Sequence, residues 1–148
     1  MPLDKSFVGR TYPAAARYEV GLEKIREFAD AIGDPNPVYR DVAAARAAGH
    51  PTVVAPPTFV TIINLTAIRV IVGDPELGLD WSRVVHGEQT FSYHRPVLAG
   101  DTLDLTVTIE NVMTRAGNDF LTARADISTV DGEPVSTGTA TIVARGAA

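Results

Sequence analysis

The chain has 148 residues, with 13 basic and 18 acidic side chains, a net charge of −5 and no cysteine. This length suits one domain with a single core, and the lack of cysteine excludes disulfides, thiolate metal sites and a cysteine nucleophile. No basic stripe suits nucleic acid, and neither a leader segment nor an uninterrupted apolar stretch of membrane-spanning length is visible, so we expect a cytoplasmic protein that does not enter the membrane.

Two helices are predicted before the middle of the chain. Between Leu22 and Ile32 apolar residues recur at helical spacing, with charged residues between them, and Gly33 ends the pattern. A second, short helix is predicted from Val42 to Ala48, where Asp41 is the candidate N-cap and Gly49 the left-handed residue after the end.

A third segment, from Pro57 to Val72, is apolar on most sides. Its β-branched residues favour a strand, but its length, the prolines before it and Gly73 after it favour a helix. We therefore expect a largely buried helix in which three residues are mostly buried: Ile62, Ile63 and Leu65.

After Trp81 apolar and polar residues alternate, as in half-buried antiparallel strands. Tight hairpin turns are predicted at Gly117-Asn118 and at Asp131-Gly132. A buried helix followed by such strands predicts an α+β fold in which the sheet covers the helix, within a single domain over residues 1–148. The expected meander has four strands: 84–94, 102–115, 119–130 and 134–144.

Three motifs, in order along the chain, carry a family resemblance. They are Gly33-Asp34-Pro35-Asn36-Pro37-Val38-Tyr39, the run from Val54 to Phe59, and Tyr93-His94-Arg95-Pro96-Val97-Leu98-Ala99-Gly100-Asp101. Together they resemble the MaoC-like, R-specific enoyl hydratases and 3-hydroxyacyl dehydratases. The resemblance implies a hot-dog fold, in which a curved antiparallel sheet wraps around a long central helix. More narrowly, the chain resembles an actinobacterial subgroup related to the non-catalytic subunit of heterodimeric 3-hydroxyacyl-ACP dehydratases.

The resemblance also implies a degenerate catalytic site. Hydration of an enoyl thioester needs a base for water, a group that moves the proton at the α-carbon and a donor for the charge on the thioester oxygen. In the family an Asp/His pair supplies the first two, and a backbone N–H at the start of the central helix supplies the third. Asp34 matches the catalytic aspartate, but Tyr39 stands in place of the histidine, and Pro57, which has no N–H, stands in place of the usual glycine.

The family motifs further imply a set of residues at an acyl-thioester cleft. Without the resemblance, Asp34-Pro35 and Asn36-Pro37 are ordinary turn sequences. A separate candidate is His86, which we expect to share one strand face with Glu88, either as a dimer-contact residue or as a replacement base. The substrate-binding residues expected are Asn36, Tyr39, Pro57, Thr58, Phe59 and His86. Neither metal-ligand spacing nor a glycine-rich phosphate loop is present, so we expect no metal and no cofactor.

Three functions fit the sequence. The favoured one is the substrate-holding subunit of an R-specific 3-hydroxyacyl thioester dehydratase in fatty acid metabolism, which binds acyl-ACP or acyl-CoA and pairs with a catalytic MaoC-like chain. The second is a homodimeric acyl-thioester or lipid-binding protein without turnover. The third is a self-sufficient hydratase that uses Asp34 with an atypical base such as His86. A dimer is expected in each case, because hot-dog domains pair through their sheets.

Overall fold

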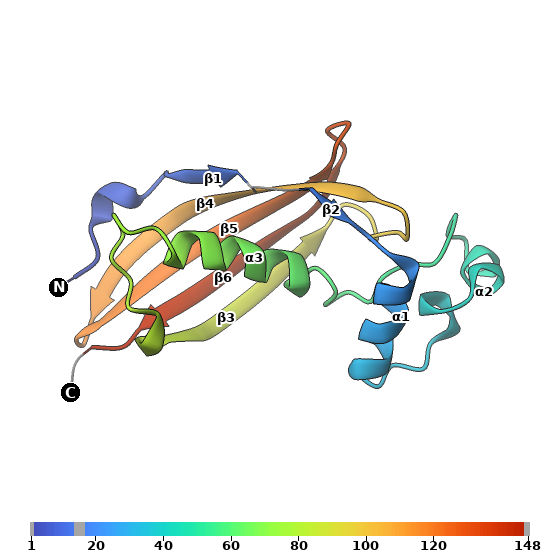
Figure 1. The fold of residues 1–148 in the computed structure, drawn as a ribbon, viewed down its shortest axis with the longest axis horizontal. Helices are drawn as coiled ribbons and strands as arrows, with labels where there is room; N and C mark the ends of the chain where they lie inside the picture. Colours follow the sequence, from blue (N-terminus) through green and yellow to red (C-terminus); the bar gives the residue numbers. More distant parts are fainter. Residues whose placement is uncertain (1, 14–16, 147–148) are drawn as a thin grey trace.

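Four long strands form the main part of an antiparallel sheet, with one long helix lying along it (Figure 1). The structure, a computed structural model, describes residues 2–13 and 17–146. The strands agree with the predicted ranges to within one residue because alternating apolar side chains pack against the helix. Their bounds are β3 Val84–Tyr93, β4 Thr102–Arg115, β5 Asn118–Thr129 and β6 Pro134–Ala144.

The sheet is wider than the sequence predicts, and its order differs from a simple meander. Two short strands, β1 (Thr11–Pro13) and β2 (Tyr18–Glu19), both pair with β4. The order is β1-β4-β5-β6-β3, so β3 lies beside β6 and not beside β4. The prediction of a four-strand meander is therefore wrong for β3, because its partner is decided by packing between distant segments.

The β4–β5 turn lies one residue earlier than predicted. Arg115 pairs with Asn118, so the two turn residues are Ala116 and Gly117, with φ angles of 49° and 74°. Two positive φ angles in succession are what a type I′ hairpin turn requires. The second predicted turn is confirmed, since Gly132 has a φ of 91° between β5 and β6.

Helix α3 (Thr61–Val72) is the predicted third helix, but it begins four residues later than expected. Residues 57–60 form turns instead, in which Phe59 N–H donates to Pro56 O and Thr61 N–H donates to Thr58 O. Both bonds span three residues, so the segment consists of tight turns and not of a regular α-helical turn.

One face of α3 packs on the sheet, and the other face stays open in the single chain. Ile63 is 2% exposed, as predicted, and Ile62 is half-buried. Leu65, in contrast, is 42% exposed, so the prediction that it is buried is wrong. The sheet covers the helix from one side only, which leaves apolar residues on the other side without a cover in this chain (Figure 1).

Two helices overhang one end of the sheet: α1 (Leu22–Ala31) and α2 (Val42–Ala47). The predicted cap of α2 is confirmed, because the Asp41 carboxylate accepts the N–H groups of Ala43 and Ala44. Gly33 and Gly49 have φ angles of 71° and 94°, the left-handed conformation expected where these helices end.

Aromatic rings and backbone contacts join the overhanging helices to the sheet. The Phe59 ring, which is fully buried, packs edge-on against Phe28 of α1 with 5.5 Å between ring centroids. The run before it is paired with the turn after β3, since Ala55 N–H donates to Val97 O and Ala99 N–H donates to Val53 O. Three short 3-10 helices, not predicted, complete the fold: η1 (Lys5–Phe7), η2 (Pro37–Tyr39) and η3 (Trp81–Arg83). Over the described residues, no helix is long and apolar enough to cross a membrane.

Candidate functional site

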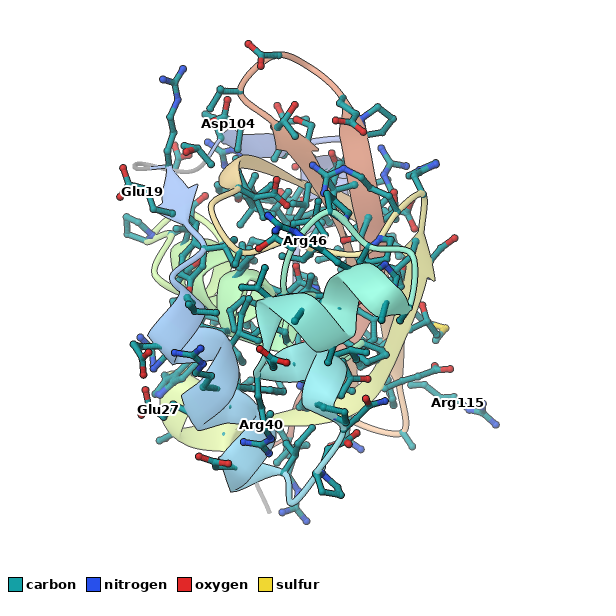
Figure 2. The ribbon with its side chains drawn as sticks, turned by 90° about the vertical axis from the view of Figure 1, so that its right-hand side faces the viewer. Glu19, Glu27, Arg40, Arg46, Asp104 and Arg115 are labelled. Carbon is teal, nitrogen blue, oxygen red and sulfur yellow. The ribbon has the colours of Figure 1, made fainter. Side chains whose placement is uncertain are left out.

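The loop between α1 and α2 places Asp34 and Asn36 in two successive turns. The Asp34 carboxylate accepts the N–H of Asn36 at 3.0 Å, and the Asn36 side chain accepts the N–H of Val38 at 3.1 Å. Arg40, visible at the end of α1 in Figure 2, donates to the Asp34 carbonyl at 2.5 Å and pairs with Asp30. Within this chain the side chains of Asp34 and Asn36 therefore each stabilise a turn, as their Asp-Pro and Asn-Pro sequences predict.

Tyr39, the residue expected in place of the motif histidine, is the last residue of η2. It is half-buried and packs against the core. Burial raises the pKa of its phenol, and the negative charge of Asp34 raises it further. The phenol is therefore protonated at neutral pH, so it can donate a hydrogen bond but cannot serve as a general base.

The segment before α3 lines an open cleft of about 360 Å³ together with the end of β3. Pro57 is exposed there, and its carbonyl accepts a hydrogen bond from the Tyr93 hydroxyl. Burial raises the pKa of Tyr93 to about 12, which keeps this donor protonated. The N–H of Thr58 has no acceptor within the described part of the chain, whereas those of Phe59 and Thr61 are paired.

Two other predicted site residues lie away from the cleft. Phe59 is buried in the core, and His86 lies at the far end of β3. His86 is the third residue of β3, and that strand starts at the end of the sheet opposite to α1 and α2 (Figure 1). Its Nε2 lies 3.0 Å from the carbonyl oxygen of Glu88. Within one chain, then, His86 is not brought to Asp34.

The prediction that His86 and Glu88 share a strand face is wrong. A bulge at Gly87 shifts the register, so His86 pairs with Ile142 and Glu88 pairs with Thr141. Consecutive residues of β6 point to opposite faces of the sheet, and so do their partners.

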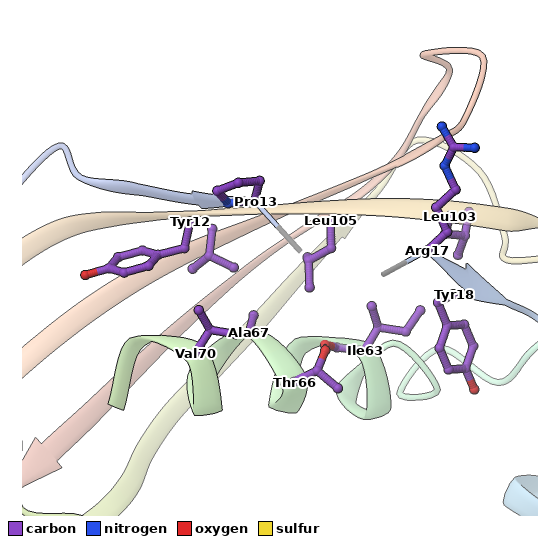
Figure 3. A pocket seen from close by; sticks show the side chains of 11 residues that line it. Tyr12, Pro13, Arg17, Tyr18, Ile63, Thr66, Ala67, Val70, Leu103 and Leu105 are labelled. Carbon is purple, nitrogen blue, oxygen red and sulfur yellow. The ribbon is translucent and has the colours of Figure 1, made fainter. Parts of the chain in front are cut away.

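An apolar cavity of about 280 Å³ lies between α3 and β4 and was not predicted from the sequence (Figure 3). From α3, Ile63, Ala67 and Val70 face it, and β4 supplies three branched side chains opposite. The remaining lining residues come from the short strands and the segment joining them. The lining from the strand side is Tyr12, Pro13, Arg17, Tyr18, Leu103, Leu105 and Val107.

Polar groups on the wall of this cavity are largely paired within the chain. The Tyr12 hydroxyl donates to Asp74 at 2.7 Å, and the Thr66 hydroxyl donates to the Ile63 carbonyl at 2.5 Å. Arg17 Nε donates to Asp104 at 3.2 Å. Because these groups are already satisfied, the wall offers an occupant mainly apolar contact. The alternation in β4 and the small residue Ala67 were the only sequence signals, since β1 and β2 are too short to show a period.

Strand β3 presents a second feature of functional interest, an unpaired edge. Among the described residues it pairs with β6 alone, so its outer backbone groups are free. Exposed apolar side chains lie on this strand and on the adjoining helix, with Val85 44% and Leu65 42% exposed. Free strand edges of this kind are templates for pairing with another chain. In the described parts of the chain no group of three metal-ligating side chains is found.

A curved antiparallel sheet along one central helix, with the Asp34 loop beyond one end of the sheet (Figure 1), defines a hot-dog domain of the hydratase and dehydratase type. The chain belongs to the family described as "FAS1-like, dehydratase domain region", whose model matches residues 6–138. The expected membership of the MaoC-like hydratases and dehydratases is confirmed with it.

Relatives and solved structures agree with this assignment. A UPF0336 protein of Saccharopolyspora erythraea is 60% identical over 148 residues, which are 100% of this chain and 95% of the relative. A chain of the C-terminally truncated HadBC (3R-hydroxyacyl-ACP dehydratase) complex from Mycobacterium tuberculosis is 31% identical with a TM-score of 0.86, over 97% of this chain and 99% of that chain. A MaoC-like dehydratase is 34% identical with a TM-score of 0.88, over 96% of this chain and 43% of that one.

Proposed function

We propose that this chain is the substrate-holding subunit of an R-specific 3-hydroxyacyl thioester dehydratase, equivalently an enoyl hydratase. In this proposal a catalytic MaoC-like partner supplies the Asp/His pair, and this chain holds the acyl chain of an acyl-ACP or acyl-CoA. The observation that carries the proposal is Tyr39, which occupies the place of the catalytic histidine and is protonated at neutral pH.

The start of α3 supports the same conclusion. Pro56 and Pro57 supply no N–H, and the nearest free N–H is that of Thr58 at the exposed beginning of the turn. Loss of one oxyanion donor costs on the order of 3 kcal/mol of transition-state stabilisation. With both the base and the expected donor altered, we expect very slow turnover by this chain alone.

The apolar cavity supports a role in holding substrate. Its wall is lined by branched and aromatic side chains, and its polar groups are largely satisfied internally. A saturated acyl chain placed there would lose contact with water without leaving polar groups unpaired. The thioester end would lie toward Pro57 and Tyr93, where the open cleft begins.

A partner is proposed for the free edge of β3. Addition of a strand would satisfy the outer backbone groups, and it would cover Val85 and the open face of α3. HadBC, a similar structure, is a complex of a 3R-hydroxyacyl-ACP dehydratase. We therefore expect a dimer with a homologue or with a second copy; light scattering that returns a mass near 15.7 kDa at micromolar concentrations would argue against pairing.

The decisive experiment is co-expression with a short protein that is encoded by a neighbouring gene and carries the complete Asp…His signature. Each chain and the purified pair are then assayed for hydration of crotonyl and longer enoyl thioesters. We expect activity from the pair, little from this chain, and loss of the pair's activity when the partner's motif histidine is changed to alanine. Turnover by the isolated chain on the order of tens per second, abolished by Asp34→Asn, would overturn the proposal.

Restoring the missing groups gives an independent test. Tyr39→His alone is expected to recover little activity in the isolated chain, because the donor at the start of α3 is still altered. The combination of Tyr39→His with Pro56→His and Pro57→Gly should exceed the product of the separate effects, since groups that act together are strongly non-additive.

A second candidate, a homodimeric acyl-thioester or lipid-binding protein without turnover, is favoured by the same cavity in a chain whose Tyr39 cannot act as a base. It predicts tight binding of acyl thioesters by the isolated chain, and no gain of activity on mixing with any MaoC-like partner. The co-expression assay separates the two candidates directly.

A further inference from the structure

Between α3 and the sheet, two side-chain amides have atoms without hydrogen-bond partners, although Gln89 Nε2 donates to the Thr90 carbonyl at 3.1 Å. Asn64 is 3% exposed, and neither its Oδ1 nor its Nδ2 has a partner in the described part of the chain. The Oε1 of Gln89 on β3 is also buried and unpaired, and so is the hydroxyl of Ser136 on β6. A buried polar atom without a partner destabilises the folded chain, and such atoms are rare in folded proteins. Asn64 and Gln89 line the same small cavity, so their unpaired atoms lie around a common space.

The strand register explains why these amides meet at one point. Gln89 pairs with Ala140, and the next row on the same face of the sheet contains Gly138. A Cβ atom at Gly138 would lie 2.5 Å from Asn64 Nδ2 and 3.3 Å from Gln89 Nε2. Only glycine therefore leaves room for the Asn64 amide against the sheet with the Gln89 amide beside it.

The space between the two amides is a cavity of about 10 Å³, lined by Asn64, Gln89 and Gly138 together with small and branched residues. This is roughly the space that one water-sized group needs. Ala67 and Val107 line this small cavity and also line the larger apolar cavity. The polar cavity thus adjoins the inner wall of the space proposed for the acyl chain.

From this arrangement we infer that Asn64 and Gln89 form a polar subsite for one oxygen atom carried on the acyl chain. The substrate class is an acyl thioester with a hydroxyl group beyond the 3-position. The inference rests on the proposed function, since it requires the apolar cavity to hold the acyl chain.

The chemistry of a hydroxyl group matches the two amides. Asn64 Nδ2 can donate to the hydroxyl oxygen, and Gln89 Oε1 or Asn64 Oδ1 can accept its proton. A plain methylene at the same point would leave all three atoms unpaired and separated from water. Sites that hydrogen-bond a substrate hydroxyl discriminate strongly against the analogue that lacks it, by up to about 10⁴- to 10⁵-fold.

The position of Asn64 places the subsite away from the reacting carbons. It lies three residues beyond the first residue of α3, and so roughly 4.5 Å further along the helix axis. The thioester end is proposed outside the start of α3, beside Pro57. An oxygen that reaches Asn64 is therefore attached further along the chain than the carbons at which water is added.

The test uses the full-length chain and a series of medium-chain acyl-CoA thioesters that differ only in the position of one hydroxyl group beyond C3, with the unsubstituted thioester as reference. Calorimetry is expected to show that at least one isomer binds at least about tenfold more tightly than the reference. Asn64→Leu and Gln89→Leu should remove this preference while binding of the reference is retained or improved. Asn111→Leu, an exposed amide on β4, is the matched control and should keep the preference.

The outcomes separate the subsite from the proposed function. Binding of the reference with no preference for any hydroxylated isomer overturns the subsite and leaves the acyl cavity intact. Failure of every thioester to bind overturns both. If Asn64→Leu does not fold, Gln89→Leu provides the same comparison, and a preference that survives this substitution contradicts the inference.

Discussion

The helix–sheet unit and the overhanging segment from Gly33 to Thr52 are held in different ways. In the first, α3 lies on a sheet whose inner face is a continuous set of apolar side chains, and each strand adds many equivalent contacts. In the second, single polar groups fix the backbone, such as Asp34 on the Asn36 N–H and Asp41 on the N–H groups of α2.

The residues that hold the fold together are therefore largely different from those on which the proposed chemistry depends. Because many residues share the work in the helix–sheet unit, the fold does not depend on most of them individually. In the overhanging segment the proposed function depends on one residue: we propose that Tyr39 replaces the base of the family reaction while the backbone turn at η2 is kept. Under this proposal, the fold is kept while the catalytic ability is lost.

The largest expected effect is in the helix–sheet unit. Ile63→Asp places a charge at a position that is 2% exposed, and we expect it to cost more than about 4 kcal/mol and to abolish cooperative unfolding. The control is Leu65→Asp, two residues along the same helix and 42% exposed in the single chain, which should cost the folding of the single chain about 1 kcal/mol or less. Urea denaturation followed by circular dichroism measures both. A cooperatively folding Ile63→Asp variant would show that α3 is not the core.

The next largest loss of stability is expected at the turn after β3, which joins the two regions. Asp101 accepts two hydrogen bonds from Arg95, at 2.8 and 3.0 Å, and one from the Leu98 N–H at 2.8 Å, which fixes the turn that pairs with residues 53–55. Both partners are mostly buried, at 21% and 13% exposure. Asp101→Ala removes all three of these hydrogen bonds and leaves Glu133 as the acidic partner of Arg95, and it should cost about 2–3 kcal/mol.

Asp104→Ala is the matched control for that joint. Its carboxylate bonds Arg17, and both side chains are largely exposed, so we expect a loss below about 0.5 kcal/mol. Equal losses for the two variants, measured by urea denaturation, would mean that the turn after β3 does not hold the two regions together.

Much of the helix–sheet unit could be predicted because its signals are periodic. Apolar and polar residues alternate over ten or more positions in the long strands, so these strands could be predicted. Apolar residues at helical spacing likewise predicted α1. Strands β1 and β2, with three and two residues, are too short for any period. The place of β3 beside β6 and the open side of α3 depend on contacts between distant segments, so Leu65 was wrongly expected to be buried.

The candidate site shows the same limit more strongly. The turn roles of Asp34 and Asn36 follow from local sequence, because each bonds a backbone N–H two residues away. The apolar cavity and the Asn64 subsite join α3 to strands up to 76 residues further along the chain, so no local pattern could show them. The bulge that separates His86 from Glu88 likewise depends on the register with β6.

A smaller effect is expected in the overhanging segment. Asp34→Ala removes the acceptor for the Asn36 N–H and should cost about 1 kcal/mol, with faster amide exchange confined to the loop between α1 and α2. Asp34→Asn keeps a side-chain oxygen in the same place and should stay close to wild type. If Asp34→Ala accelerates exchange throughout the sheet as well, the two regions unfold as one unit and the comparison fails.

The smallest effect concerns pH and belongs to the edge of the helix–sheet unit. Burial, followed by the hydrogen bond to Asp74, raises the pKa of Tyr12 to about 12 from 10.0, so the unfolded chain ionises first as pH rises. The stabilisation is complete below about pH 10 and is lost as pH rises toward 12; solvent screening limits it to about 1 kcal/mol. Tyr12→Phe loses the 2.7 Å bond to Asp74 at neutral pH, but its stability should then fall less steeply than that of wild type between about pH 9 and 11 in urea titrations. Parallel curves for the two proteins would show that Tyr12 does not contribute to alkaline unfolding.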